Sequence, residues 1–175
     1  MKIIPSLFIL ILISSCGFQS IYKAGNADLV GDEYKQELAS IEIKNGRKYI
    51  DQQLKNNLEN ILNPDSLKVD HKYLLTIQLK KTLTSALTTS TGSSGRNKVI
   101  LNASYILKNL ETGQVISAEE VTAKDDFDVQ DKRFGNYIAE ETIGLNVTKI
   151  LAQNIRDLLI RDLAEQNEKS EQNEK

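Results

Sequence analysis

Four basic residues flank a run of hydroxyl-bearing and glycine residues in the middle of the chain. Lys80 and Lys81 precede the run at 84–95, and Arg96 and Lys98 follow it. The run has too few large apolar side chains to bury itself, so we expect a mobile tip between two paired strands. Pairing about its centre would gather four cations, whose mutual repulsion a phosphorylated anion would relieve. The alternative is that they are solvated edge residues that discourage aggregation.

Cys16 is the only cysteine, and it follows a segment with three successive characters. Lys2 gives a positive start, residues 3–13 are almost wholly apolar, and Ser14 and Ser15 are small. This order is typical of a secretory signal peptide. The apolar run has about half of the roughly 20 residues that a membrane-spanning helix needs, so a cleaved signal fits better than a retained anchor.

The sequence Ile13-Ser14-Ser15-Cys16 resembles the lipobox of bacterial lipoproteins. The resemblance implies removal of residues 1–15, a diacylglycerol on the thiol and an acyl group on the new amine. Two or more chains anchor a protein stably, whereas one binds marginally. The next residue is Gly17 and not the Asp that commonly retains lipoproteins at the inner membrane, which implies the periplasmic face of the outer membrane. An ordinary signal with an incidental cysteine is the alternative.

Composition limits the remaining possibilities. The 175 residues have a formal net charge of −2, which does not suit a nucleic-acid binder. Apolar residues make up 40% of the chain, enough for the core of one domain, and charged residues make up 26%. With Cys16 lipidated no thiol remains for a disulfide, so we expect packing to stabilise the fold.

The sequence gives little support for an enzyme. His71 is the only histidine, and no nucleophile elbow, phosphate-binding glycine loop or metal-spaced cluster occurs. The acids at 125–128 lack the glycine and distal glutamate of a known calcium loop, so we interpret them as a solvated acidic turn. We therefore expect no catalytic residues, no metal and no cofactor.

Hydrophobic periodicity predicts alternating strand and helix segments. Period-two segments predict strands, and spacings of three to four predict helices. The predicted strands cover 38–44, 69–83, 96–107 and 115–123, the last extending toward 129. The predicted helices cover 47–62, ended by Asn63-Pro64, and 131–164. We prefer packing within the chain to a coiled coil for the long helix, whose stripe includes Tyr137, Ile138, Leu151 and Ile155.

These segments predict an α+β fold with the order β-α-β-β-β-α. We expect a four-stranded, mostly antiparallel sheet covered on one face by two helices. The predicted domains are a cleaved signal at 1–15, a lipidated tether at 16–33 and the α/β domain at 34–164. The charged repeat at 165–175 has no apolar residue, so we expect it to be disordered.

The segment Cys16-Gly17-Phe18-Gln19-Ser20-Ile21-Tyr22 is similar to the CGFxPLY opening of the lipopolysaccharide-assembly lipoprotein family, with Ser20 and Ile21 in place of Pro-Leu. Looser matches occur at 102–115 and at 137–141. The resemblance covers about residues 16–164, and the two-helix, four-stranded fold of that family coincides with the one predicted above.

The resemblance implies a plug in the lumen of the outer-membrane barrel that inserts lipopolysaccharide. The partners would be that barrel, lipopolysaccharide at Lys80, Lys81, Arg96 and Lys98, and the membrane through Cys16. The alternative is a lipoprotein auxiliary of an intermembrane lipid transporter, which should present an apolar groove between sheet and helix.

Overall fold

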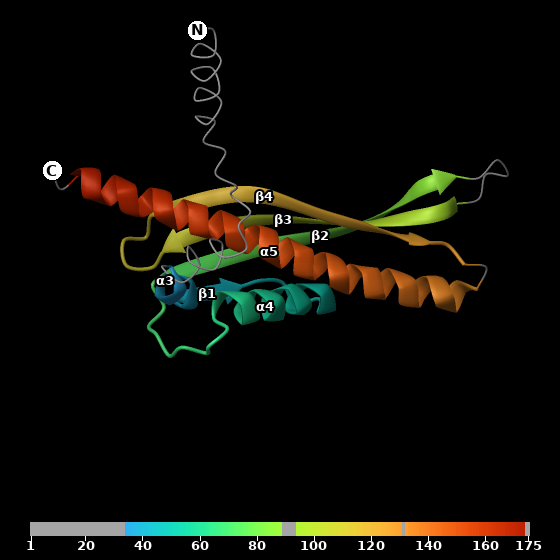
Figure 1. The fold of residues 1–175 in the computed structure, drawn as a ribbon, viewed down its shortest axis with the longest axis horizontal. Helices are drawn as coiled ribbons and strands as arrows, with labels where there is room; N and C mark the ends of the chain where they lie inside the picture. The colour runs from blue at the N-terminus through green and yellow to red at the C-terminus, as the bar shows by residue number, and fades with distance from the viewer. Residues whose placement is uncertain (1–33, 89–93, 131, 174–175) are drawn as a thin grey trace, which may run out of the picture. The chain divides into compact units, whose positions relative to one another are not determined.

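A four-stranded sheet organises the described part of the chain. The computed structural model describes residues 34–88, 94–130 and 132–173, and residues 34–175 form one compact unit by themselves. The predicted signal peptide, Cys16 and the tether lie outside these residues. The sheet order is β1-β2-β3-β4, in which β1 (Ile41–Lys44) is parallel to β2 (Tyr73–Thr88). Strands β3 (Ser94–Asn109) and β4 (Val115–Asp128) complete an antiparallel meander (Figure 1).

The β2–β3 hairpin is longer than predicted. We expected the run 84–95 to be a mobile tip, but β2 continues to Thr88 and β3 starts at Ser94. Residues 89–93 are outside the described part of the chain. Threonines favour extended backbone, and the pairing of Thr84 with Lys98 satisfies backbone groups without burying side chains. The pairing shifts register between Ser85 and Leu87, which marks a bulge near the end of β2.

The first element differs from the prediction. Residues 38–40 were expected in a strand, but Lys35–Ala39 forms the short helix α3 and β1 begins at Ile41. Leu38 and Ala39 are both buried. In a strand of a sheet that is covered on one face, two successive side chains would point to opposite faces, and one of them would be exposed. The Ser40 backbone N–H donates to the carbonyls of Gln36 and Glu37 and ends the helix. Only Ile41–Lys44 keeps strict alternation.

Helix α4 (Tyr49–Leu62) forms as predicted, with Leu54, Leu58 and Leu62 buried against the sheet. The buried Asp51 stabilises its start, because its carboxylate accepts a hydrogen bond of 3.0 Å from the Lys48 backbone N–H. A Cβ at Gly46 would lie 2.1 Å from Asp51 Oδ2. A side chain at Gly46 would therefore displace the Asp51 carboxylate from the start of α4.

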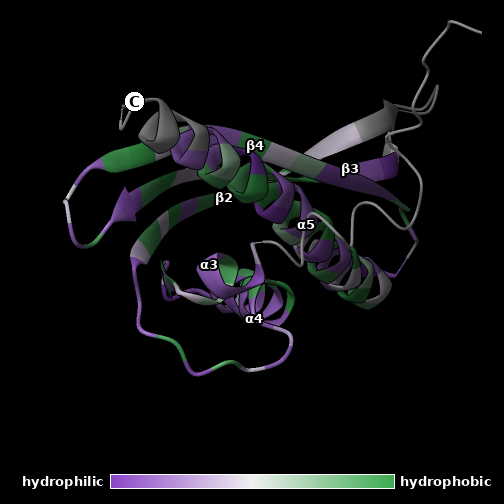
Figure 2. Ribbon diagram, turned by 60° about the vertical axis from the view of Figure 1, so that its left-hand side comes forward, coloured by the Kyte–Doolittle hydropathy of each residue, from purple (hydrophilic) through white to green (hydrophobic). Residues whose placement is uncertain are grey.

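Helix α5 (Arg133–Asn173) is the longest element, with 41 residues or about 60 Å of helix. It runs across β3 and β4, and α4 lies beside it and against β1 (Figure 1). Hydrophobic and hydrophilic residues alternate along α5 (Figure 2). Leu151, Ile155 and Leu159 are fully buried, as the predicted stripe requires. The helix also includes Glu165 to Asn173, where we expected disorder.

The start of α5 contradicts the predicted stripe. Tyr137 is 60% exposed and Ile138 is 46% exposed, although both were expected in the core. The reason is that α4 begins only opposite Gly144, where Ile50 Cδ1 lies within 3.8 Å of a Cβ built on that glycine. The first turns of α5 therefore have the sheet as a neighbour but not α4.

One buried polar group joins α5 to the sheet. The Tyr105 hydroxyl on β3 donates a 3.0 Å hydrogen bond to Asp162 Oδ2 on α5, and both residues are buried. Arg161 pairs with Asp162 at 2.8 Å and also with Glu119 on β4. Burial raises the pKa of the Tyr105 hydroxyl, so it stays protonated as the donor. The helix register on the sheet is thereby fixed by a specific contact as well as by apolar packing.

The packing of α5 can be tested by adjacent substitutions. We expect Leu151→Ala to lower the free energy of unfolding by about 2–5 kcal/mol, since it leaves a cavity in the core. Ile150→Ala is the matched control, because Ile150 is 41% exposed, and its cost should stay below about 1 kcal/mol. Urea unfolding of both variants measures the difference, and equal costs would contradict the described face of α5.

Candidate functional site

The four predicted cations lie on two different faces of the sheet. Lys81 pairs in register with the buried Leu101 and therefore points to the helix-covered side. Its ammonium lies 2.8 Å from Glu140 Oε1 and 3.5 Å from Glu141 Oε1 on α5. Partial burial acts to lower the pKa of Lys81, but hydrogen bonds and charges from both glutamates outweigh it, and the pKa is raised. Lys81 thus holds the start of α5 to β2.

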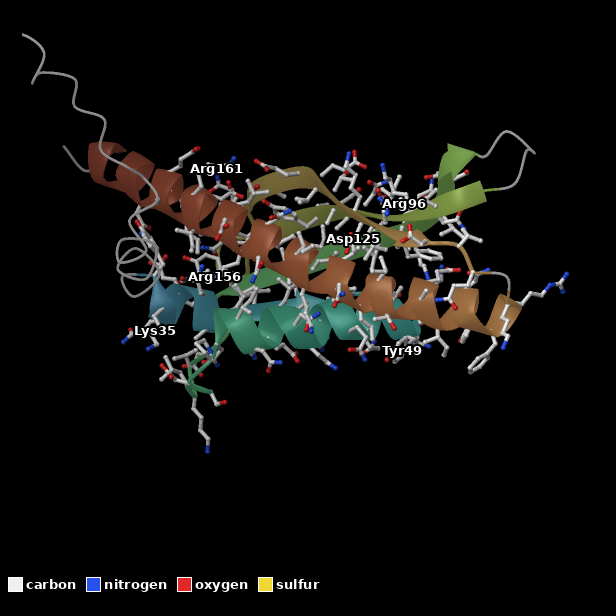
Figure 3. All side chains as sticks on the ribbon, turned by 45° about the vertical axis from the view of Figure 1, so that its right-hand side comes forward. Lys35, Tyr49, Arg96, Asp125, Arg156 and Arg161 are labelled. Atoms are coloured by element: carbon white, nitrogen blue, oxygen red, sulfur yellow. The ribbon has the colours of Figure 1, made fainter. Side chains whose placement is uncertain are left out.

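Arg96 and Lys98 lie on the opposite, uncovered face of the sheet. Each is paired with an acid on the neighbouring strand: Arg96 Nη2 lies 2.8 Å from Asp128 Oδ1, and Lys98 Nζ lies 3.7 Å from Asp126 Oδ1. These partners are opposite one another in the β3–β4 register. The side chain of Arg96 extends near the far end of the hairpin in Figure 3. The acids that we predicted to be solvated are thus cross-strand partners of these two cations.

Lys80 is exposed on the same uncovered face as Lys98 but lies farther from the tip. It is opposite Asn102, which is four residues from Lys98 along β3, or about 13 Å of strand. The predicted gathering of four cations at one point is therefore wrong, because register and side-chain alternation separate them. Binding of lipopolysaccharide by these residues stays a prediction. Of the four cations, Lys80 is the one that makes no ion pair with another described residue.

The sequence did not reveal an apolar groove between the end of β4 and the start of α5. This β4–α5 groove has a volume of about 490 Å³. Phe127, which is only 7% exposed, is one of its walls, and Phe134, which is 75% exposed, is another. The full lining is Phe127, Gln130, Phe134, Gly135, Ile138, Ala139, Thr142 and Ile143.

The groove lies on the side of α5 that faces the end of β4, since its lining combines Phe127 and Gln130 with Phe134 to Ile143. The apolar period from Phe134 to Ile143 was visible in the sequence, but it predicted a buried stripe. The missing information was how closely the end of β4 packs against the first turns of α5, and periodicity within one helix does not contain it.

A second hollow of about 500 Å³ lies beside β1 and α4. Its lining mixes buried core residues such as Ile41 and Ile43 with polar side chains such as Glu59 and Asn60. His71 also lies on its rim and is exposed. Among the described residues, no group of three or more His, Cys, Asp or Glu is placed to hold a metal ion. Within the described part of the chain, this hollow therefore has no such metal-binding group.

The fold is found in several solved bacterial proteins. A Caulobacter crescentus protein described as a candidate lipoprotein has a TM-score of 0.62 at 14% identity, over 77% of this chain and 97% of that one. Rare lipoprotein B from Shewanella oneidensis has a TM-score of 0.61 at 11% identity, over 73% of this chain and 98% of that one. A minor lipoprotein from Acinetobacter baumannii gives 0.53 at 13% identity, over 70% and 90%.

At these identities the likeness is one of fold. No family model matches the sequence, and no curated protein matches it with significance. Within the described residues, none of the helices combines the length and apolar character needed to span a membrane. The α+β architecture predicted from the sequence thus also occurs in solved bacterial lipoproteins.

The role of Lys81 can be separated from that of its neighbour. We expect Lys81→Met to lower the free energy of unfolding by about 0.5–1 kcal/mol at neutral pH, since two glutamates lose their cation. The folded-state pKa of Lys81 is raised, so this contribution is complete below its unfolded pKa of 10.5 and is lost as pH rises through the higher folded value. Urea unfolding at pH 8 and above pH 10.5 measures both effects.

Lys80→Met is the control for that measurement, because Lys80 lies on the uncovered face without an ion pair among the described residues. Its substitution should leave the free energy of unfolding within about 0.5 kcal/mol. A pH-independent loss in Lys81→Met would show that apolar packing, and not charge, explains the role of Lys81.

Proposed function

We propose that the protein is a lipid-anchored accessory of lipopolysaccharide transport at the periplasmic face of the outer membrane. In this proposal the α/β domain plugs and supports the barrel that inserts lipopolysaccharide, and it contacts lipopolysaccharide. The anchor is Cys16, whose lipidation follows from the lipobox resemblance. The proposal needs a protein surface that can lie against the wall of a water-filled barrel lumen.

The observation that carries the proposal is the uncovered face of the sheet. Strands β2, β3 and β4 have 16, 16 and 14 residues, or about 50 Å for the longer two. Both helices that cover the sheet lie on its other side (Figure 1). The uncovered face presents mainly hydroxyl, amide and charged side chains, such as Gln78, Lys80, Asn102, Ser104, Glu120, Thr122 and Lys124.

Such a face suits a hydrated lumen for a physical reason. Its side chains can exchange hydrogen bonds with water and with polar groups of a surrounding wall, and they need no apolar partner to be stable. The Thr122 hydroxyl, for example, already donates a 2.7 Å hydrogen bond to Asn102 Oδ1 across the strands. The fold shared with bacterial lipoproteins and the similarity of residues 16–22 to the family opening add support.

Contact with lipopolysaccharide would use exposed cations on that face. Lys80 and Lys124 are both exposed there, and neither has an ion pair among the described residues. Arg96 and Lys98 would first have to leave Asp128 and Asp126. The proposal therefore assigns the first contact with a phosphate to Lys80 and Lys124. The sequence analysis did not single out Lys124.

The lipid-transporter auxiliary remains the second candidate, and one observation favours it. That role requires an apolar groove between sheet and helix, and the β4–α5 groove lies between those two elements. The two roles differ in the partner they predict. An outer-membrane barrel is expected for the plug, and an inner-membrane complex is expected for the transporter auxiliary.

A bulky substitution on the uncovered face tests the plug. We expect Ser104→Trp to lower co-purification of the full-length protein with its barrel about tenfold, because the indole would clash with a close wall; this corresponds to about 1.4 kcal/mol. Ser104 is exposed at the centre of the face, between Gln78 and Glu120. Detergent extraction followed by mass spectrometry of the captured partners measures the effect.

Asn56→Trp is the matched control, since Asn56 is exposed on α4 on the helix-covered side. The Asn56→Trp variant should co-purify with the barrel in the same yield as the unsubstituted protein. Capture of inner-membrane transport proteins would support the second candidate, and a barrel yield that is unchanged in Ser104→Trp would reject the assigned surface.

Lipid anchoring is tested independently at Cys16. We expect Cys16→Ser to remove the acyl mass from the mature N-terminus and to move the protein out of the outer-membrane fraction, because a serine hydroxyl cannot take the thioether-linked diacylglycerol. Mass spectrometry and membrane fractionation measure the two results. An unmodified N-terminus in the unsubstituted protein would refute the anchor itself.

A further inference from the structure

The β4–α5 groove has the size and lining of a small-molecule site, and the plug role does not use it. Its volume of about 490 Å³ lies within the roughly 300–1,000 Å³ of ligand pockets. Phe134, Ile138 and Ile143 line it from α5, and Phe127 lines it from β4. Phe134 and Ile138 are 75% and 46% exposed, so the apolar surface is open to a ligand and is not part of the closed core.

The lining favours an alkyl chain over a polypeptide. The side chains with hydrogen-bonding groups in the lining are Gln130 and Thr142. A peptide segment lying in the groove would bring several backbone N–H and C=O groups away from water, and each would need a partner. An alkyl chain has no such groups, and burial of each methylene contributes about 0.8 kcal/mol.

Two cations stand where the groove begins. Lys132 and Arg133 lie in sequence between the lining residues Gln130 and Phe134, and both are exposed. Neither makes an ion pair with another described residue, whereas the nearby acid Glu140 pairs with Lys81. A negatively charged head group at this position would therefore meet cations that have no competing partner in the described structure.

We propose that the β4–α5 groove binds one acyl chain of an anionic lipid, with the lipid head group at Lys132 and Arg133. Apolar lining for the chain and exposed cations for the head group match the two halves of such a molecule. The inference goes beyond the plug role and holds or fails separately from it, because the uncovered sheet face is formed by other residues.

Photo-cross-linking in the full-length chain tests the proposal in cells. Phe134→p-benzoylphenylalanine keeps an aromatic ring at the groove and reacts with C–H bonds close to it. Mass spectrometry of the purified protein then identifies the adduct. We expect adducts with the mass of a single anionic lipid, and none from the same substitution at Ile150, which is also exposed on α5 but outside the groove.

A groove-filling substitution distinguishes a bound chain from general insertion of this end into a bilayer. In the chain with the photoreactive residue at 134, Ala139→Leu should lower the adduct yield about tenfold, since leucine occupies the space of the chain; this corresponds to about 1.4 kcal/mol. Added apolar bulk would leave bilayer insertion unchanged or strengthen it. Thr142→Leu is a second filling variant if Ala139→Leu proves unstable to urea.

The head-group contact has its own variant. Lys132→Gln with Arg133→Gln should reduce adducts with anionic lipids and leave any adducts with zwitterionic lipids in place. The proposal is overturned by adducts to proteins alone, by equal lipid adducts at Ile150, or by an unchanged adduct yield in both filling variants. None of these results would bear on barrel capture, so the plug role is tested apart from the groove.

Discussion

The packing of α5 against one side of the meander is the interaction on which the rest of the structure depends. Leu151, Ile155 and Leu159 are fully buried in the same core as Leu101 and Leu107 of β3. A sheet of three long strands needs one apolar face covered to be stable, and burial of each such side chain contributes roughly 1.5–3 kcal/mol. Because α4 and α5 both take the same side, the other side remains free to be polar.

This one-sided covering explains the uncovered polar face. The uncovered face can have Ser104 and Thr122 at its centre because no helix has to pack on it. The β4–α5 groove lies where β4 ends, between Phe127 and the first turns of α5. A polar face and an apolar groove thus occur on one small domain without any loss of core.

The sequence predicted the fold well because the core follows simple periods. Alternation in β3 and the spacing of Leu54 and Leu58 in α4 are satisfied by the same buried face. The short helix α3 was missed because five residues carry too little periodicity. Helix α5 continues to Asn173, beyond the predicted end at 164, because charged, apolar-poor segments with good helix propensity can continue an existing helix.

The candidate site was less predictable, because it depends on pairing between elements. The positions of Lys80, Lys81, Arg96 and Lys98 suggested one cluster, but the register decides which face each cation takes. The prediction of one cation cluster failed most clearly at Lys81. Its neighbour Lys80 is exposed, whereas Lys81 pairs with Glu140 on a helix far along the chain. No local spacing contains such a partner.

The parallel pairing of β1 with β2 has a consequence for how the domain folds and opens. Strands β2, β3 and β4 are neighbours in sequence and can assemble hairpin by hairpin, whereas β1 can reach Tyr73–Thr76 only after the chain through α4 has closed on itself. With four residues, β1 adds few backbone bonds in return. Amide protons of Ile41–Lys44 should therefore exchange with solvent through subglobal opening, ahead of those at the centre of β3.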